Sequence, residues 1–385
     1  MKKIIILVLC LALCACTDYA ELNTLSIVTA VSIDKEKDNY KMAVLIANSP
    51  KAQTTSKEGE AKTTVYEAKG KTIAEVIKLI DKKTPKKLYF SHINVVIISE
   101  EIGKEGFLKT ADWLMRHPQT RNRFYLMQVK NDKASDVLKI ISPLESFPSQ
   151  SIATLIESSQ NAKANTSAAS YSNFIGRVLE KGYDPIMPTI IINGSVKKGS
   201  KQENLETAMP NTYLSLGPIA IYKKDKLIAT STRKETEMIQ LINGEAKELT
   251  SKIKYKNITA NIFAENIKSK ISLKDKNKIE IKIKMLGNIY EINGNINIDN
   301  PKNIKKLEKK WSKTLKKDIK KLINKTTKKY KTDIFGFGNL IYKNHPKKWK
   351  KIKNNYLSKL DIKVKVDTSI ISTGSLTKTL KEGEK

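Results

Sequence analysis

The sequence predicts a multi-domain protein of mixed α/β and α+β class, with mixed sheets and packed helices and with a C-terminal antiparallel sheet covered by a long helix. Apolar runs typical of buried strands alternate with helical patterns over about residues 20–195. Near the C-terminus, residues 277–298 alternate apolar and polar side chains, and a long lysine-rich helical pattern follows them. A chain of 385 residues is long enough for two or three domains.

The elements of the N-terminal half follow from local patterns. Residues 25–50 read "LSIVTAVSIDKEKDNYKMAVLIANSP", which predicts two strands joined by a polar turn. Thr72 is the expected N-cap of a helix that ends before Pro85. The run "INVVIIS" predicts a short strand that is buried on both faces. We expect a helix at 106–118, a strand at 123–129, short helices at 134–141 and 149–159, and an exposed loop at 49–64.

The middle of the chain is less regular. Residues 194–212 lose the apolar pattern, and either a linker or a long hairpin loop would fit them. The run "IAIYKKDKLIAT" then predicts a hairpin with its turn at Lys224 and Asp225. Thr232 and Glu235 have the spacing of a capping box at the start of the next helix.

The last third predicts a half-exposed sheet and a helix laid across it. Ile279, Ile281, Ile283 and Met285 alternate with Glu280, Lys282 and Lys284. Apolar residues then recur at helical spacing from Ile304 to Tyr330, with Pro301 in the first turn. From Lys302 to Lys331 fourteen lysines face two acidic residues, a net charge of +12 (14 − 2). An edge-like strand, "DIKVKVDTSIIST", follows near the end of the chain.

The start of the chain has the pattern of a signal peptide. Lys2 and Lys3 precede ten apolar residues, a run too short to span a bilayer, which needs about 20. The ending Leu13-Cys14-Ala15-Cys16 resembles the lipobox of bacterial lipoproteins. The resemblance implies that the Cys16 thiol takes a diacylglycerol and that cleavage leaves this cysteine as the new N-terminus. An ordinary secretory signal with a chance cysteine is the alternative. We therefore expect a signal peptide at 1–15, an N-terminal region at 16–198, with two possible subdomains, and a C-terminal domain at 212–376.

Charge and composition limit the function classes. The net charge is +32, or +30 without Lys2 and Lys3 (32 − 2). For a tethered protein this favours anionic lipid over nucleic acid as a partner, and we expect no nucleic acid partner. Exposed Lys309, Lys313, Lys316 and Lys320 are the candidate membrane or partner surface, although a merely solvated lysine-rich face is an equal alternative.

Motifs for chemistry are missing from the sequence. The three cysteines lie at positions 10, 14 and 16, so the processed chain would carry no cysteine nucleophile, disulfide or cysteine zinc site. His92, His117 and His345 lack metal-ligand spacing, and the lone G-x-G of Gly336 and Gly338 is better explained by a tight bend. We expect a non-enzymatic protein with no catalytic residue, no cofactor and no metal.

Several stretches, in order, resemble the Ger(x)C family, the lipoprotein C subunits of bacterial spore germinant receptors. They are "CTDYAELN" from Cys16, "GKTIAEVI", "LYFSHINVVIISEEIGKEG", "DWLMRHPQTR", "DIFGFGNLIYKNHPKKWKKIK" and "VDTSIISTGS". Many members carry Trp directly after the cysteine, where this chain has Thr17. Of the residues, only Cys16 corresponds to a functional position of the family.

The resemblance implies a three-domain mixed α/β protein of unusual topology without established enzyme activity. It also implies a role in spore germination, on the outer face of the spore inner membrane, through assembly with an A-type membrane subunit and a permease-like B-type subunit. The alternative function is a solute-capturing lipoprotein that serves a membrane transporter, and an envelope enzyme is a more distant one.

Overall fold

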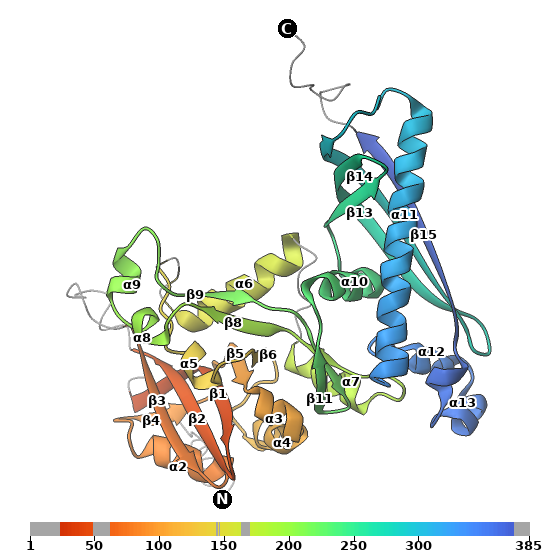
Figure 1. The fold of residues 1–385 in the computed structure, drawn as a ribbon. Helices are drawn as coiled ribbons and strands as arrows, with labels where there is room; N and C mark the ends of the chain where they lie inside the picture. Colours follow the sequence, from red (N-terminus) through yellow and green to blue (C-terminus); the bar gives the residue numbers. More distant parts are fainter. Residues whose placement is uncertain (1–23, 49–61, 144, 146, 163–169, 373–385) are drawn as a thin grey trace, which may run out of the picture.

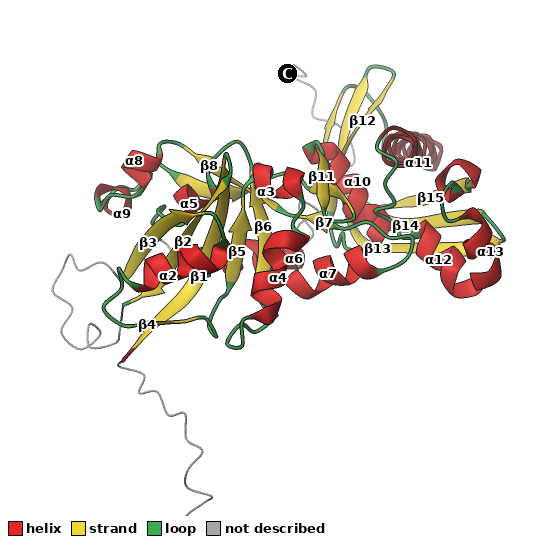
Figure 2. Ribbon diagram, turned by 90° about the horizontal axis from the view of Figure 1, so that it is seen from below, coloured by secondary structure: helices red, strands yellow, loops and turns green. Residues whose placement is uncertain are grey.

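The first sheet forms the centre of the N-terminal half of the computed structural model, which describes residues 24–48, 62–143, 145, 147–162 and 170–372 (Figures 1 and 2). Its strands are β1 (Leu25–Glu36), β2 (Asn39–Ala47), β3 (Thr63–Gly70), β4 (Lys87–Tyr89), β5 (Val95–Ile98), β6 (Tyr125–Val129), β8 (Thr189–Asn193) and β9 (Tyr213–Leu216). The order is β3-β2-β1-β5-β6-β8-β9, and β4 pairs with β1. β5 runs parallel to both β1 and β6, whereas β2, β3 and β9 are antiparallel to their neighbours.

Helices cover both faces of this sheet. One face carries α2 (Ile73–Asp81), α3 (Glu100–Glu105), α4 (Leu108–Arg116) and α7 (Tyr171–Leu179), and the other carries α5 (Ala134–Val137) and α6 (Pro148–Ala162). Val95 and Ile97 of β5 belong to one core, and Val96 and Ile98 belong to the other. The expectation of a strand buried on both faces is therefore confirmed.

Residues 194–212 connect two paired strands. The segment contains α8 (Val196–Gly199) and α9 (Glu203–Glu206). β8 and β9 on either side of it are antiparallel neighbours, which decides for a hairpin connection over a linker. Asn204 holds the connection together, since its side chain bonds to the backbone of both Ile141 and Thr212.

A small three-stranded sheet follows the first one. It consists of β7 (Ile186–Met187), β10 (Ala220–Lys223) and β11 (Lys226–Thr230), with α10 (Arg233–Asn243) directly after it. The expected hairpin forms between β10 and β11, with Lys224 at a positive φ of 55° in the turn. The expected capping box is also present, because Thr232 and Glu235 each accept a backbone N–H of the other.

The C-terminal sheet has four strands and is covered on one face by α11 (Pro301–Asn324) (Figure 1). Its strands are β12 (Leu249–Tyr255), β13 (Ile258–Asp275), β14 (Lys278–Asn293) and β15 (Asp361–Ser372), in that order. The first three are antiparallel as expected, but β15 runs parallel to β14. The parallel pairing follows from the long crossover between β14 and β15, which contains α11, α12 (Phe337–Asn344) and α13 (Pro346–Ile352).

α11 packs on this sheet through the stripe that its sequence predicts. Its buried residues are Leu307, Trp311, Leu315, Ile319, Leu322 and Ile323. They face the alternating residues of β14, which are buried from Ile279 to Met285. Trp311 is fully buried and lies directly over Gly287, where an added Cβ would come within 2.7 Å of the indole. The missing side chain at 287 thus makes room for the ring.

A buried aspartate, Asp333, joins the crossover to the N-terminal half. Asp333 accepts hydrogen bonds from the backbone N–H groups of Phe337 (3.1 Å) and Gly338 (2.7 Å) at the start of α12, and from the Tyr356 hydroxyl (2.9 Å). Its own N–H donates to Asp184 Oδ2 at 2.7 Å, and the Asp184 N–H donates to the Asp333 carbonyl. Gly336 precedes α12 at a positive φ of 72°, consistent with the expected tight bend.

We expect Gly287→Ala to destabilise the C-terminal sheet by about 1–3 kcal/mol, because the new methyl group overpacks the space beside Trp311 and Ile262. Urea denaturation measures the loss. Trp311→Phe in the same chain should recover part of it, since the smaller ring leaves room. Lys284→Ala, on the opposite face of the same strand, is the matched control. Strictly additive losses in the double variant would contradict the contact.

Burial raises the pKa of Asp333 from 3.8 to about 6 against the opposing effect of its three hydrogen-bond donors. A folded-state pKa above the unfolded one means that the folded state binds the proton more tightly. Stability that Asp333 contributes should therefore be present below about pH 4 and be lost as the pH rises to about 6, by on the order of 3 kcal/mol.

The measurement compares unfolding free energies of wild type and Asp333→Asn between pH 4 and 7. The wild type should lose stability relative to the variant as the pH rises. A constant difference across this range would mean that the carboxylate keeps its ordinary pKa.

Candidate functional site

The exposed side of α11 presents a dense row of lysines. Lys309, Lys313, Lys316 and Lys320 are all exposed, as expected from the sequence. In the described residues none of these four makes an ion pair, because both carboxylates of the helix are already engaged. Asp318 pairs with Lys234 at 2.7 Å, and Glu308 accepts the backbone N–H of Ile370 at 2.8 Å.

The two ends of α11 are fixed by local contacts. Asn300 caps the N-terminus by accepting the N–H of Lys302, and Pro301 occupies the first turn. At the C-terminus the helix continues into a π-helical turn at Lys325–Lys329, where Lys325 bonds to Glu235 at 2.7 Å. Burial alone would raise the pKa of Glu235, but the bonds from Lys325 and Thr232 outweigh burial and hold this pKa below its ordinary value.

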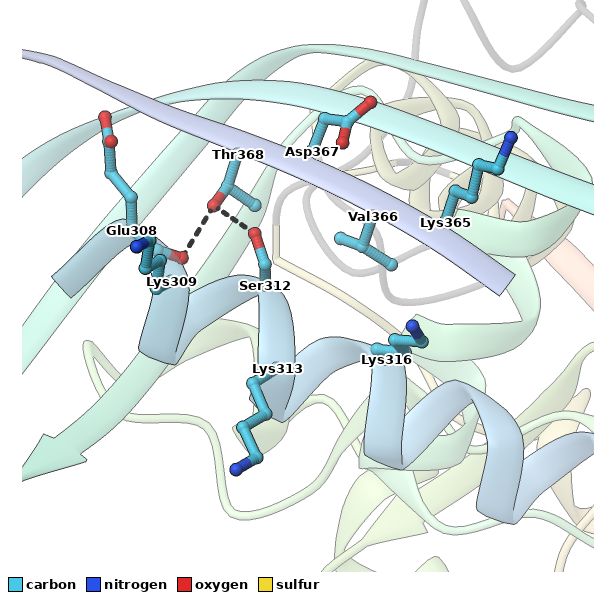
Figure 3. Close-up of a pocket in the computed structure, with 9 residues that line it drawn as sticks. All are labelled: Glu308, Lys309, Ser312, Lys313, Lys316, Lys365, Val366, Asp367 and Thr368. Carbon is cyan, nitrogen blue, oxygen red and sulfur yellow. Dashed lines mark hydrogen bonds between the residues drawn. The ribbon is translucent and has the colours of Figure 1, made fainter. Parts of the chain in front are cut away.

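A groove of about 540 Å³ runs between α11 and β15 (Figure 3). Its lining residues are Glu308, Lys309, Ser312, Lys313 and Lys316 from the helix, and Lys365, Val366, Asp367 and Thr368 from the strand. Three of the four candidate lysines therefore line one groove, and Lys320 lies outside its lining.

Short hydrogen bonds fix the helix against the strand at one end of the groove. The Thr368 hydroxyl donates to the Glu308 carbonyl at 3.1 Å and lies 2.8 Å from the Ser312 hydroxyl. Figure 3 shows these bonds, and it shows Lys365 and Asp367 on the side of β15 that is turned away from the helix. Lys365 pairs there with Glu280 of β14 at 2.6 Å. The lysines of α11 are thus the unpaired cations of the groove lining.

β15 lies at the edge of the C-terminal sheet and pairs only with β14 among the described strands. The backbone N–H of Asp361 points to β14, where it donates to the Asn277 carbonyl. The N–H of Ile370 points the opposite way, to Glu308. Successive residues of a strand direct their N–H and C=O groups to opposite sides in the plane of the sheet. The even-numbered residues from Ile362 to Ile370 therefore direct these groups away from β14, toward the groove.

The groove contains residues that the sequence analysis did not single out. Glu308, Ser312 and Thr368 were missed because isolated polar side chains carry no spacing signal of their own. Lys365 and Asp367 could have been placed on the outer face of their strand from the alternation in "DIKVKVD". The position of their strand beside α11 depends on the parallel return of β15, which no local pattern encodes.

The other candidate residues lie apart from the groove. Cys16 lies outside the described residues. His92 and His345 are exposed. His117 packs between Phe90 and Trp113, and burial lowers its pKa. Gly336 and Gly338 lie at the start of α12 around the Asp333 carboxylate.

The described residues contain neither a candidate metal cluster nor a candidate membrane-spanning helix. No cluster of three or more His, Cys, Asp or Glu side chains in this part of the chain could hold a metal ion. Among the helices of the described ranges, none combines the length and the apolar character that crossing a bilayer requires.

The sequence matches models for both halves of one protein family. The model of the spore germination protein N-terminal domain matches residues 18–192, and the spore germination B3/GerAC-like C-terminal model matches residues 218–374. Spore germination protein KC of Bacillus subtilis is 26% identical over an alignment of 396 positions, which covers 97% of this chain and 96% of that protein. Spore germination protein GerQC of Bacillus cereus is 25% identical over 325 residues, or 82% of this chain and 84% of that protein.

The fold is also similar to a solved structure. The crystal structure of the GerBC protein superposes with a TM-score of 0.51 at 17% identity, and the match covers 92% of this chain and 100% of that one. At this identity the similarity shows a shared fold. Together with the two family models, which leave only residues 193–217 between them unmatched, it supports one conclusion: the chain belongs to the Ger(x)C family of spore germination proteins.

Proposed function

We propose that this protein is a non-enzymatic lipoprotein subunit of a nutrient germinant receptor, held on the outer face of the spore inner membrane and assembled with an A-type and a permease-like B-type membrane subunit. The observation that carries the proposal is the match of the two germination family models over residues 18–192 and 218–374. Spore germination protein KC, similar over nearly the whole length of both chains, supports the same role.

The proposed attachment to the membrane is a diacylglycerol on Cys16. Two acyl chains give stable anchoring where a single chain is marginal. The described structure begins at Thr24, and the first sheet starts one residue later with β1 at Leu25. Only residues 17–24 would therefore separate the lipid from the first strand. A tether this short would keep the folded part near the bilayer and raise its effective concentration for membrane partners.

The second element of the proposal is the surface of Lys309, Lys313, Lys316 and Lys320. An exposed lysine near an anionic surface adds about 1 kcal/mol of attraction. Because α11 is anchored on its sheet by a buried stripe, these side chains have a fixed common direction. We propose that they orient the C-terminal domain against anionic lipid or an acidic partner. The expected bounds of this domain are 212–376, and those of the N-terminal region are 16–198.

We expect spores that lack this gene to lose the response to at least one nutrient, and Cys16→Ala to reproduce the loss at least in part. Dipicolinate release against a panel of amino acids measures the response, and membrane fractionation follows the anchor. Normal release with every nutrient would refute the receptor role and favour the solute-capturing alternative, which binding of a free amino acid to the purified chain would then support.

Charge reversal of Lys309, Lys313, Lys316 and Lys320 to Glu should lower the germination rate without unfolding the protein, because all four side chains are exposed. The matched control reverses Lys252, Lys254, Lys282 and Lys284, which are exposed on the opposite face of the same sheet and give the same change in charge. Receptor level by immunoblot and germination rate are compared. Equal rates in the two variants would mean that α11 is only a solvated face.

A further inference from the structure

We propose that the groove between α11 and β15 binds an extended acidic segment of a partner protein, which adds to the C-terminal sheet as a fifth strand beside β15. The presence of such a partner rests on the proposed function, in which the protein assembles with other subunits. The binding itself is argued from the strand edge, from the charge of the groove and from its size.

The strand edge supplies unused backbone groups. The even-numbered residues of β15 direct their N–H and C=O groups away from β14, as the opposite directions of the Asp361 and Ile370 N–H groups require. Within the described ranges, the outward backbone groups of Val366 make no hydrogen bond, and Val366 is only half-buried, whereas Val364 is 1% exposed. An open edge of this kind is the template that β-strand addition uses in peptide recognition.

One position of the same edge already binds a carboxylate. Glu308 reaches from α11 to the N–H of Ile370, and its Oε1 lies 2.8 Å from that nitrogen. Thr368, the next outward residue, is tied to the helix through its hydroxyl. The edge is therefore covered by α11 at Thr368 and Ile370, and its open position within the groove is Val366, which lines the groove and is only half-buried.

The charge of the groove selects an acidic occupant. Lys309, Lys313 and Lys316 line it from the helix, and they have no carboxylate partner among the described residues. Side chains of an added strand alternate between the two faces of the sheet. Those on the face that carries α11 would lie beside these lysines. Acidic residues at every second position of the partner are therefore the complementary pattern.

The dimensions of the groove suit a short strand. The helix side extends from Glu308 to Lys316, about 12 Å at 1.5 Å per residue. The strand side extends from Lys365 to Thr368, about four residues at 3.3 Å each. The two sides run in opposite directions, since Glu308 meets Ile370 and Ser312 meets Thr368. A segment of about four residues can therefore contact both sides along its length.

An extended peptide fits these features better than a lipid headgroup does. A headgroup phosphate would use the lysines but would leave the outward backbone groups of Val366 without a partner. The carboxylates of Glu308 and Asp367 also line the groove, so an occupant must place its negative charges beside the lysines and away from these two groups. A strand can place its acidic side chains beside the lysines and pair its amides with the edge.

The experiment measures fluorescence anisotropy of a labelled seven-residue peptide of alternating glutamate and valine, added to the full processed chain in detergent micelles. A lysine–valine peptide tests the charge. Two further glutamate–valine peptides carry N-methyl groups on every second amide, one on the glutamates and one on the valines. Strand pairing uses alternate amides, so one methylated peptide should lose binding and the other should keep it.

The protein variants test the place of binding. Lys309→Glu combined with Lys316→Glu should weaken the glutamate–valine peptide about tenfold or more, which corresponds to about 1.4 kcal/mol. Lys317→Glu combined with Lys321→Glu is the matched control, because both lysines are exposed on the same helix and neither lines the groove. Circular dichroism confirms that all variants are folded.

Three outcomes would overturn the proposal: no binding of the glutamate–valine peptide, equal effects of the two lysine pairs, or equal binding of both methylated peptides. Vesicles of phosphatidylglycerol are measured in parallel. Loss of vesicle binding in the Lys309 and Lys316 variant, without peptide binding, would assign the groove to lipid instead. Peptide binding is read on the purified chain and germination on spores, so the inference and the proposed function can fail separately.

Discussion

The packing of α11 on the C-terminal sheet is the constraint on which the functional surface depends. Trp311 is fully buried and occupies the space that Gly287 leaves open in β14. With the other buried residues of the stripe it fixes the rotation of the helix about its own axis. Once that rotation is set, Lys309, Lys313 and Lys316 lie on the flank of the helix that lines the groove. The direction of the cations is thus a consequence of the apolar contact.

The return path of the chain provides the other side of the groove. In the chain, α12 and α13 come between α11 and β15. The Asp333 carboxylate stabilises this crossover by binding the first turn of α12 and the Tyr356 hydroxyl. The backbone N–H of Asp333 donates to the Asp184 carboxylate, and the Asp333 carbonyl accepts the N–H of Asp184, which precedes β7. Asp333 therefore joins the crossover to the N-terminal half: its carboxylate binds within the crossover, and its backbone binds Asp184.

The proposed anchor and the proposed groove would complement each other physically. A lipid at Cys16 would confine the molecule to the membrane surface, so that a contact with a membrane partner becomes nearly intramolecular. Under that condition a short added strand with a few charge pairs is sufficient, although such a contact is weak between free molecules. The lysine row outside the groove, which includes Lys320, would remain available to anionic headgroups in the same complex.

The sequence by itself determined the local structure and the family. Period-two alternation set the buried face of β14, helical spacing set the stripe of α11, and Thr72, Thr232 and Pro301 marked helix starts, because each depends on side chains close together in the chain. It also placed the four exposed lysines. Only the tertiary structure decided that β15 returns parallel to β14, that Gly287 receives Trp311, and that three of those lysines share a groove with a strand edge. These features join residues up to 84 positions apart (372 − 288, for Asn288 and Ser372), and no local pattern specifies which distant segments meet.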